Sequence, residues 1–258
     1  MASQGTPSPA ALVDQARLVA QRTMISVVIP TLNAQATLPN TLAALIPAAV
    51  GGLIREVIVV DGGSADLTCQ LADSAGAEVI AAKPSRGGQL LAGAARAKHP
   101  WLLFLHADTV LDSGWEREVS HFIECVETGK ARLAAAAFRF ALDDEGAPPR
   151  ILERLVRLRC AVLRWPYGDQ GLLIPRRLYD EVGGYRSLAV MEDIDLTRRL
   201  GARRLKILRA RAVTSAQRYR REGYVQRTLK NQMCLFMYAL NVPSTRILQF
   251  YGENEQKP

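Results

Sequence analysis

Two polar residues that could bind a metal or a phosphate follow a strongly apolar run in the middle of the chain. Trp101–Leu105 consists of bulky apolar residues typical of a buried strand, and His106 and Asp108 come directly after it. Residues two positions apart on an extended backbone point to the same side, so the imidazole and the carboxylate could face one ligand. In an open α/β sheet, ligands bind at the carboxyl ends of the strands. The pattern is compatible with a metal or phosphate site, and a plain polar turn that ends the strand is the alternative.

A second acid stands at the end of another apolar run. Val60 is followed by Asp61, two glycines and Ser64, which is a good helix N-cap. Glycine lets a ligand approach the backbone closely, and the carboxylate can accept hydrogen bonds from a nucleobase or a ribose. The same residues also make an ordinary strand-to-helix turn, so this motif alone leaves both interpretations open.

The elements that must position these residues alternate along the first half of the chain. Apolar runs rich in β-branched residues predict strands, and the segments between them have helical patterns. Strands are predicted over 25–29, 56–60, 78–81 and 101–105, and helices over about 37–48 and 65–75 and, after Ser85–Gly88, to about Lys98. Strands that are apolar on both faces indicate a mostly parallel sheet covered by helices on two sides. Asn33, Asp61, His106 and Asp108 each follow a strand, so we expect them to meet in one crevice.

Beyond Asp108 the pattern is less regular. Helices are predicted over about 113–127 and 150–164, strands over 132–142 and 172–175, a turn over 143–149 and a loop over 165–171. The segment contains no repeat and no low-complexity linker, which favours one domain with two halves.

Composition narrows the classes of protein without choosing one. The chain has 258 residues, of which 48% are hydrophobic and 22% charged, and this is typical of a globular domain with a real core. A net charge of +8 suits a phosphorylated small molecule, an anionic membrane or nucleic acid. Zinc-finger spacing, an aromatic RNA-binding signature and a lysine-rich tail are all missing, so we expect no nucleic acid partner.

Cysteine spacing and hydropathy bear on the compartment. The four cysteines, Cys69, Cys125, Cys160 and Cys234, are far apart and form no CxxC pair, which argues against a disulfide framework or a zinc site. The first residues lack a secretory signal pattern, and no apolar run is long enough to cross a bilayer. We therefore expect a cytoplasmic protein.

Six short motifs occur in an order that resembles the family 2 glycosyltransferases, which have the GT-A fold and use nucleotide-activated sugars. The resemblance covers about residues 25–219 and rests on Ile29–Asn33, Val60–Ser64, Arg86–Gly88, Leu105–Asp108, Gly183–Tyr185 and Met191–Leu196. It implies a GT-A domain over 24–222 between a flexible leader, 1–23, and a C-terminal helix and tail, 223–258. Within the domain, 24–110 would be a Rossmann-like nucleotide-sugar half and 111–222 an acceptor half.

The resemblance also implies roles for the donor side. Pro30, Thr31, Asn33 and Asp61 would cradle the nucleoside, and Arg86 would help to bind the donor. His106-Ala107-Asp108 stands in place of the DXD motif that holds a divalent cation, Mg²⁺ or Mn²⁺, on the donor diphosphate. Because His106 replaces the first aspartate, Asp108 is the expected metal ligand. His106 is expected to be either a second ligand or a hydrogen-bonding group for the ribose.

On the acceptor side, the resemblance implies that Asp193 is the general base of an inverting transfer, because the attacking hydroxyl must lose its proton. An acid in the first turn of a helix also favours the helix dipole, which is the structural alternative. Asp195 would serve structure. The other candidates for contact with the acceptor or the diphosphate are Asp169, Gln170, Glu192 and Arg218.

The C-terminal segment Tyr224–Leu240 combines Arg227 and Lys230 with many apolar residues. It predicts an amphipathic helix that either meets a membrane carrying a lipid-linked acceptor, or packs against its own domain or a twin subunit.

Two rival functions stay open at this point. A sugar-phosphate nucleotidyltransferase would have a similar sheet, although Pro30–Asn33 lacks the expected glycine-rich signature. A GT-A module that binds nucleotide or lipid without catalysis would also explain the loss of the first DXD acid.

Overall fold

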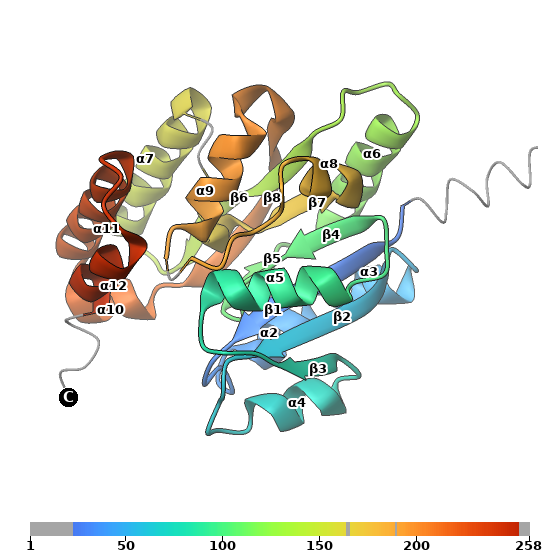
Figure 1. The fold of residues 1–258 in the computed structure, drawn as a ribbon, viewed down its shortest axis with the longest axis horizontal. Helices are drawn as coiled ribbons and strands as arrows, with labels where there is room; N and C mark the ends of the chain where they lie inside the picture. The colour runs from blue at the N-terminus through green and yellow to red at the C-terminus, as the bar shows by residue number, and fades with distance from the viewer. Residues whose placement is uncertain (1–22, 164–165, 189, 253–258) are drawn as a thin grey trace, which may run out of the picture.

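The computed structural model describes residues 23–163, 166–188 and 190–252. The predicted leader, apart from Thr23, therefore lies outside the described residues, as does the end of the tail. Figure 1 shows one central sheet with helices packed on both sides, and three C-terminal helices at its left-hand edge. No helix among the described residues is long and apolar enough to span a membrane.

The sheet has two differently built parts. Its strands are β1 (Ile25–Thr31), β2 (Ile54–Asp61), β3 (Glu78–Ala81), β4 (Trp101–Phe104), β5 (Thr109–Leu111), β6 (Ala135–Asp143), β7 (Leu172–Pro175) and β8 (Leu205–Ser215). They pair in the order β3-β2-β1-β4-β7-β6-β8-β5. The first four are parallel, whereas β7 runs antiparallel to both β4 and β6, and β5 antiparallel to β8. The predicted α/β class, with a mostly parallel central sheet flanked by helices, is confirmed.

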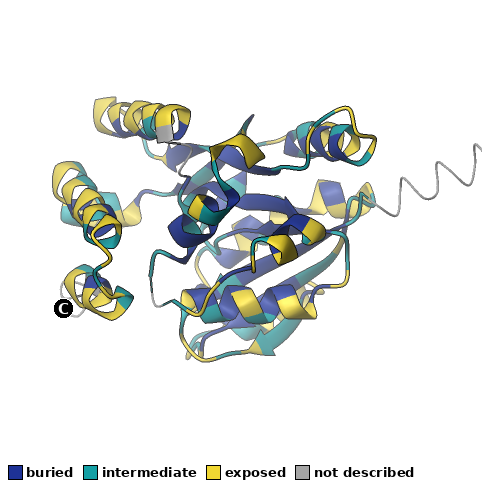
Figure 2. Ribbon diagram, turned by 45° about the horizontal axis from the view of Figure 1, so that its top comes forward, coloured by how far each residue is buried: buried dark blue, intermediate teal, exposed yellow. Residues whose placement is uncertain are grey.

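Helices cover both faces because the strands are apolar on both. The helices are α2 (Leu38–Ala43), α3 (Ile46–Val50), α4 (Thr68–Ser74), α5 (Arg86–Arg96), α6 (Trp115–Glu127), α7 (Ala147–Leu163), α8 (Arg176–Glu181), α9 (Glu192–Leu200), α10 (Gln217–Glu222), α11 (Tyr224–Ala239) and α12 (Ser244–Gly252). Along β1, Val27 and Ile29 pack with α2, α3 and α6, while Val28 packs with α5 on the opposite face. Figure 2 shows the strands buried and the outer helix faces exposed.

Two details position the site. On α5, a Cβ at Gly93 would overlap Val28, so this glycine allows the helix to lie close against β1. The helix predicted over 37–48 is instead two short helices, because Pro47 lacks an amide hydrogen and lies in the first turn of a new helix, α3. Strands β5 and β8 were not predicted.

Candidate active site

A cavity of about 610 Å³ opens at the carboxyl ends of β1 and β4, and the start of α9 forms another part of its wall. Ten of the twelve residues predicted for the site line it: Pro30, Thr31, Asn33, Arg86, His106, Asp108, Asp169, Glu192, Asp193 and Arg218. Asp61 and Gln170 do not. Of the four residues at strand ends that were expected to meet, Asn33, His106 and Asp108 therefore line one cavity, and Asp61 does not.

The turn after β1 is tied to the turn after β2 by side-chain hydrogen bonds. Asn33 has a left-handed backbone (φ 51°), a conformation that asparagine tolerates better than most residues. Its backbone N–H donates to Ser64 Oγ at 2.8 Å, and its Oδ1 accepts from the N–H of Ala65 at 2.9 Å. Gln89 of α5 donates to the carbonyls of Thr31 and Val60 at 2.8 and 2.7 Å. These bonds give one wall of the cavity a fixed shape.

Asp61 is the centre of this bonding rather than part of the cavity wall. Its Oδ2 accepts from the N–H groups of Gly63 and Ser64, both at 2.8 Å. Its Oδ1 accepts from the hydroxyls of Ser64 and Thr31 at 2.5 and 3.1 Å. Burial alone would raise the pKa of Asp61, but these hydrogen bonds outweigh it and lower the pKa. With all four bonds made inside the protein, the carboxylate acts on a ligand through the turn that it holds.

His106 and Asp108 lie in a turn, and this corrects the expectation of an extended backbone. Strand β4 ends at Phe104, and the N–H of Thr109 donates to the carbonyl of His106 at 3.2 Å. Asp108 Oδ1 accepts from the hydroxyls of Thr109 and Thr214, both at 3.5 Å, which leaves most of its capacity for a ligand. The two side chains share a cavity without the side-by-side geometry of a strand.

His106 lies beside Gly168 in the loop before β7. A Cβ at Gly168 would lie 2.6 Å from His106 Nε2 and 3.4 Å from Asp193 Oδ2. The imidazole and the carboxylate therefore both lie against Gly168, where a larger residue would overlap the imidazole. Burial, together with the charges of Arg86 and Arg218, holds the pKa of His106 well below its usual range. The imidazole is therefore neutral at physiological pH.

Helix α9 brings the acid pair to the cavity. Met191, the residue before the helix, has a left-handed backbone (φ 65°). Asp193 Oδ2 accepts from the N–H of Gly168 at 2.5 Å, and its Oδ1 accepts from the N–H of Ile194 at 2.7 Å. Glu192 is only 2% exposed and lies 3.8 Å from Arg86 Nε. Burial and the nearby charge of Asp193 raise the pKa of Glu192.

Asp195 turns away from the cavity, in keeping with a structural role. Its carboxylate lies 2.6 Å from Arg199 Nη2 and 3.2 Å from Arg186 Nη1, and it accepts a hydrogen bond from Tyr238 at 3.2 Å.

In the loop before β7, Asp169 faces the cavity and Gln170 does not. Asp169 Oδ1 is buried with no hydrogen-bond partner, and burial raises the pKa of Asp169 to about 7 against the opposing charge of Arg159. Gln170 instead donates to the carbonyl of Phe138 at 2.9 Å and accepts from the Cys160 thiol at 3.3 Å. Gln170 therefore anchors the loop, and the expected contact with the acceptor is not what its position favours.

The sequence pattern of Glycosyl transferase family 2 matches residues 26–184. The chain belongs to this family. It is a glycosyltransferase, an enzyme that moves a sugar from a nucleotide-sugar donor. No curated protein sequence matches it.

Solved structures share the fold of this glycosyltransferase. Glucosyl-3-phosphoglycerate synthase from Mycobacterium tuberculosis, in complex with Mn²⁺, UDP-glucose and phosphoglyceric acid, has a TM-score of 0.53 and 21% identity, over 80% of this chain and 76% of that one. TarS residues 1–349 from S. aureus has a TM-score of 0.56 and 16% identity, over 89% of this chain and 70% of that one. At these identities the likeness supports the GT-A fold alone.

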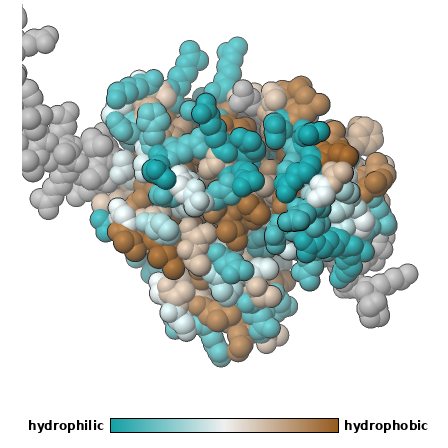
Figure 3. All heavy atoms as spheres, turned by 180° about the vertical axis from the view of Figure 1, so that it is seen from behind, coloured by the Kyte–Doolittle hydropathy of each residue, from teal (hydrophilic) through white to brown (hydrophobic). Residues whose placement is uncertain are grey.

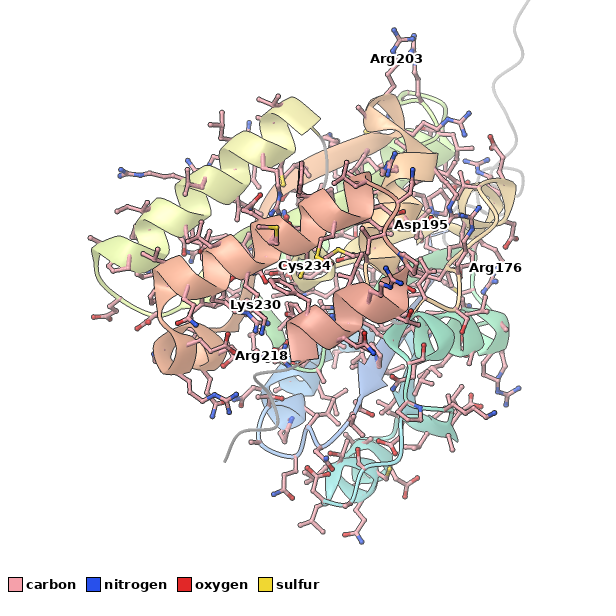
Figure 4. The ribbon with its side chains drawn as sticks, turned by 60° about the vertical axis from the view of Figure 1, so that its left-hand side comes forward. Arg176, Asp195, Arg203, Arg218, Lys230 and Cys234 are labelled. Atoms are coloured by element: carbon pink, nitrogen blue, oxygen red, sulfur yellow. The ribbon has the colours of Figure 1, made fainter. Side chains whose placement is uncertain are left out.

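Part of the glycosyltransferase cavity was not anticipated. Its far wall comes from α10–α12 and includes Tyr219, Arg227, Asn231, Ile247, Leu248 and Tyr251. Figure 4 shows α11 and α12 lying side by side with α7 at this edge. The sequence signal was the mixture of cations and apolar residues over 224–240, which predicts an amphipathic helix. The helix is present as α11, and its cations Arg227 and Lys230 lie on the buried side, at 2% and 8% exposed.

The two buried cations have different surroundings. Arg227 lies 3.1 Å from Glu222 and also binds the hydroxyl of Tyr251. The Lys230 ammonium lies 5.3 Å from the centre of the Tyr251 ring and has no hydrogen-bond partner.

Proposed function

We propose that the enzyme inverts the configuration at the sugar carbon, with Asp193 as the general base and a divalent cation held at Asp108. The observation that carries this proposal is the meeting of the Pro30–Asn33 turn, Arg86, Asp108 and Asp193 around one cavity. A nucleotide-sugar needs all of these: a site for the nucleoside, positive charge for the diphosphate, and a base on the sugar side.

On the donor side, Pro30, Thr31 and Asn33 would contact the nucleoside, with Asp61 and Gln89 keeping their turn in shape. Arg86 is half exposed and lies beside Glu192, so its guanidinium can donate hydrogen bonds to phosphate oxygens. Arg218, from α10, would add charge at the diphosphate on the other side of the cavity.

The protein atoms at Asp108 suit a cation that arrives with the donor. Among the described residues no group of three or more histidine, cysteine or acidic side chains is placed to hold a metal ion. Mg²⁺ is commonly bound by one or two carboxylates together with substrate phosphates, and Asp108 offers one such carboxylate. The synthase from M. tuberculosis was solved with Mn²⁺ or Mg²⁺ and UDP. Such an ion neutralises the charge of a departing diphosphate. Neutral His106 is the second candidate ligand.

At the reacting end, Asp193 would take the proton of the acceptor hydroxyl. The N–H of Gly168 fixes one carboxylate oxygen at 2.5 Å, which orients the group. Glu192, close to Arg86, would link the donor-binding arginine to the base. Asp169, whose buried oxygen lacks a partner, would bind an acceptor hydroxyl.

The acceptor that we propose carries its hydroxyl on a lipid-linked group, and the enzyme works in the cytoplasm. Leu248 supplies apolar surface to the far wall of the cavity, with the buried Ile247 next to it, beside the polar groups of Tyr219 and Asn231. All four cysteines are free thiols, as is usual in a reducing compartment.

A thermal-shift series with UDP-, GDP- and dTDP-sugars, with and without Mn²⁺, tests the donor site. A ligand at about 100 times its Kd stabilises the fold by about 2.7 kcal/mol, which gives a readable shift. We expect one nucleotide-sugar to stabilise the protein more in Mn²⁺, and Asp108→Ala to abolish the Mn²⁺ increment. A Mn²⁺ increment that survives in Asp108→Ala would exclude Asp108 as the ligand.

Slow hydrolysis of the same donor separates the rival functions. A glycosyltransferase leaks some sugar to water and releases nucleoside diphosphate. A nucleotidyltransferase would instead release pyrophosphate from a nucleoside triphosphate and a sugar phosphate, and a module that only binds would release neither. Either of the last two results would contradict the proposal.

A further inference from the structure

Exposed apolar side chains concentrate on one edge of the molecule, formed by α7, α11 and α12. Of the sixteen large apolar side chains exposed in the described residues, eleven belong to these helices and to Leu240, which caps α11. They are Ile151, Leu155, Leu158, Val162, Val225, Leu229, Met233, Phe236, Leu240, Leu248 and Phe250. The rest of the described surface holds five, on other elements.

The spacing of these residues makes two continuous stripes. On α7 they recur at intervals of four, three and four residues from Ile151, and on α11 at four, four, three and four from Val225. Both patterns follow one face of a helix. The exposed fractions are high, reaching 70% at Val162 and 74% at Val225.

The two stripes lie next to each other. Helix α11 contacts both α7 and α12, and Figure 4 shows the three helices crossing the front of the molecule together. The outward faces of α7 and α11 are exposed in Figure 2, and hydrophobic atoms gather on the corresponding upper right edge of Figure 3. We call this three-helix surface the apolar edge.

The charge on the apolar edge is almost entirely positive. Helices α7, α11 and α12 together contain a single acid, Glu153, and it binds Arg150 and the N–H of Leu142. Arg154 and Arg157 of α7 and Arg246 of α12 are exposed. An apolar stripe with cations along it is the pattern of a helix that lies in the surface of an anionic bilayer.

This charge also argues against a second copy of the chain as the occupant. A twofold dimer would place the same surface against itself, and arginine would then face arginine with hardly an acid to compensate. A bilayer rich in anionic headgroups supplies the missing negative charge.

We propose that the apolar edge docks the enzyme on an anionic membrane. The inner sides of α11 and α12 line the cavity, through Arg227, Asn231, Ile247 and Tyr251, and Leu248 lies where the apolar edge meets the cavity. The same helices would then meet lipid on one side and the substrate cavity on the other. This placement extends the proposed lipid-linked acceptor, although binding to the membrane itself does not depend on sugar transfer.

Co-sedimentation of the full chain with vesicles tests the proposal. We expect binding to phosphatidylcholine vesicles that contain phosphatidylglycerol, weaker binding to phosphatidylcholine alone, and release at high salt. The double variant Leu155→Gln/Leu229→Gln and the charge reversal Arg154→Glu/Arg157→Glu should each lose about tenfold or more in affinity.

Matched controls separate this surface from general effects. Val50→Gln alters an equally exposed apolar residue on α3, and Arg203→Glu reverses an exposed charge on η2 (Ala202–Arg204); both should bind vesicles like the wild type. All variants should keep their donor hydrolysis and thermal unfolding, because none of these side chains lines the cavity. If the wild type ignores anionic vesicles, or if the double variant instead abolishes a dimer seen by sedimentation equilibrium, the proposal fails while the proposed function stands.

Discussion

The donor half, residues 24–110, and the acceptor side, residues 111–252, differ in how fully their buried polar groups are bonded. In the donor half, Asp61 alone accepts four hydrogen bonds, and no buried side-chain oxygen or nitrogen of its described residues lacks a partner. On the acceptor side, Tyr167 Oη, Asp169 Oδ1 and Lys230 Nζ are buried without one. Buried polar groups without partners destabilise a fold. The buried side chains of the donor half thus have their hydrogen-bond partners within the protein. On the acceptor side, these three buried polar atoms have none and are available to a substrate.

The largest expected effect is the loss of activity when Asp193, the proposed general base, is replaced. Asp193→Asn keeps the shape of the side chain but cannot accept the proton of the acceptor, so we expect kcat to fall by about 10²–10⁴-fold. Donor affinity, measured by thermal shift, should change little, because the change lies on the acceptor side. Asp73→Asn, the same change on the exposed face of α4, should leave both values unchanged. A variant Asp193→Asn that transfers sugar at the wild-type rate would remove Asp193 from the reaction.

The second-largest expected effect is a gain in folding stability when Asp169, on the acceptor side, is replaced by asparagine. Burial raises the pKa of Asp169 from 3.8 to about 7, so the folded state holds a proton that the unfolded state has lost. Stability therefore falls as the pH rises between these two values. At about 1.4 kcal/mol for each tenfold change in proton affinity, the ionised carboxylate costs at most about 4 kcal/mol.

Asp169→Asn should accordingly unfold at a higher urea concentration than the wild type at about pH 8, with the difference shrinking as the pH falls toward 3.8, where the wild type no longer loses stability through ionisation of Asp169. Equal midpoints for the two proteins at both pH values would mean that Asp169 is bonded in solution, which would weaken the contrast between the two sides.

An Asp→Asn substitution in the donor half, at Asp61, should instead lower the stability of the fold. In Asp61→Asn an amide nitrogen replaces a carboxylate oxygen that accepts two hydrogen bonds, so we expect a loss of about 1–3 kcal/mol in urea unfolding at neutral pH. Because the folded-state pKa of Asp61 is lowered, its stabilisation is present above the unfolded value of 3.8 and disappears as the pH falls through the lowered one. If Asp61→Asn were neutral at pH 7, the turn would not depend on this carboxylate.

The smallest effect concerns Lys230. Lys230→Met keeps much of the volume and removes a buried ammonium that lacks a hydrogen-bond partner, so the fold should gain about 1 kcal/mol. Lys83→Met, at an exposed position of the donor half, should leave the Tm unchanged. A lower Tm for Lys230→Met would show that its contact with the Tyr251 ring outweighs the cost of burial.

The fold of the donor half followed from local pattern, because each of its strands is apolar on both faces and each turn carries its own signal. The acceptor side did not. In β8, arginines and a lysine are interspersed with apolar residues, so the segment lacks the apolar run that predicts a strand. Strand β5 has only three residues, which is too short for a pattern. Pairing between β5 and β8 joins residues about a hundred positions apart, which no local pattern reports.

For the site, strand ends predicted which residues meet, but not what each side chain does there. Asp61 and Gln170 have the right chemistry and position along the chain, yet their hydrogen bonds lie inside the protein. Residue type does not reveal how many of a side chain's bonds are already made. The turn at His106–Thr109 was not predicted for a similar reason. Residue types do not reveal the backbone hydrogen bond between Thr109 and His106 that forms it after the end of the strand.

The far wall of the cavity comes from one uninterrupted stretch, α10 through α12, whereas the donor wall is gathered from strand ends spread between Pro30 and Asp108. A single recombination near Ser215 would therefore replace the whole far wall, Arg218 included, and leave the turns at the strand ends in place. The opposite exchange would need coordinated changes in several turns at once. Among related enzymes, the C-terminal helices should accordingly diversify faster than the strand ends, and acceptor preference with them.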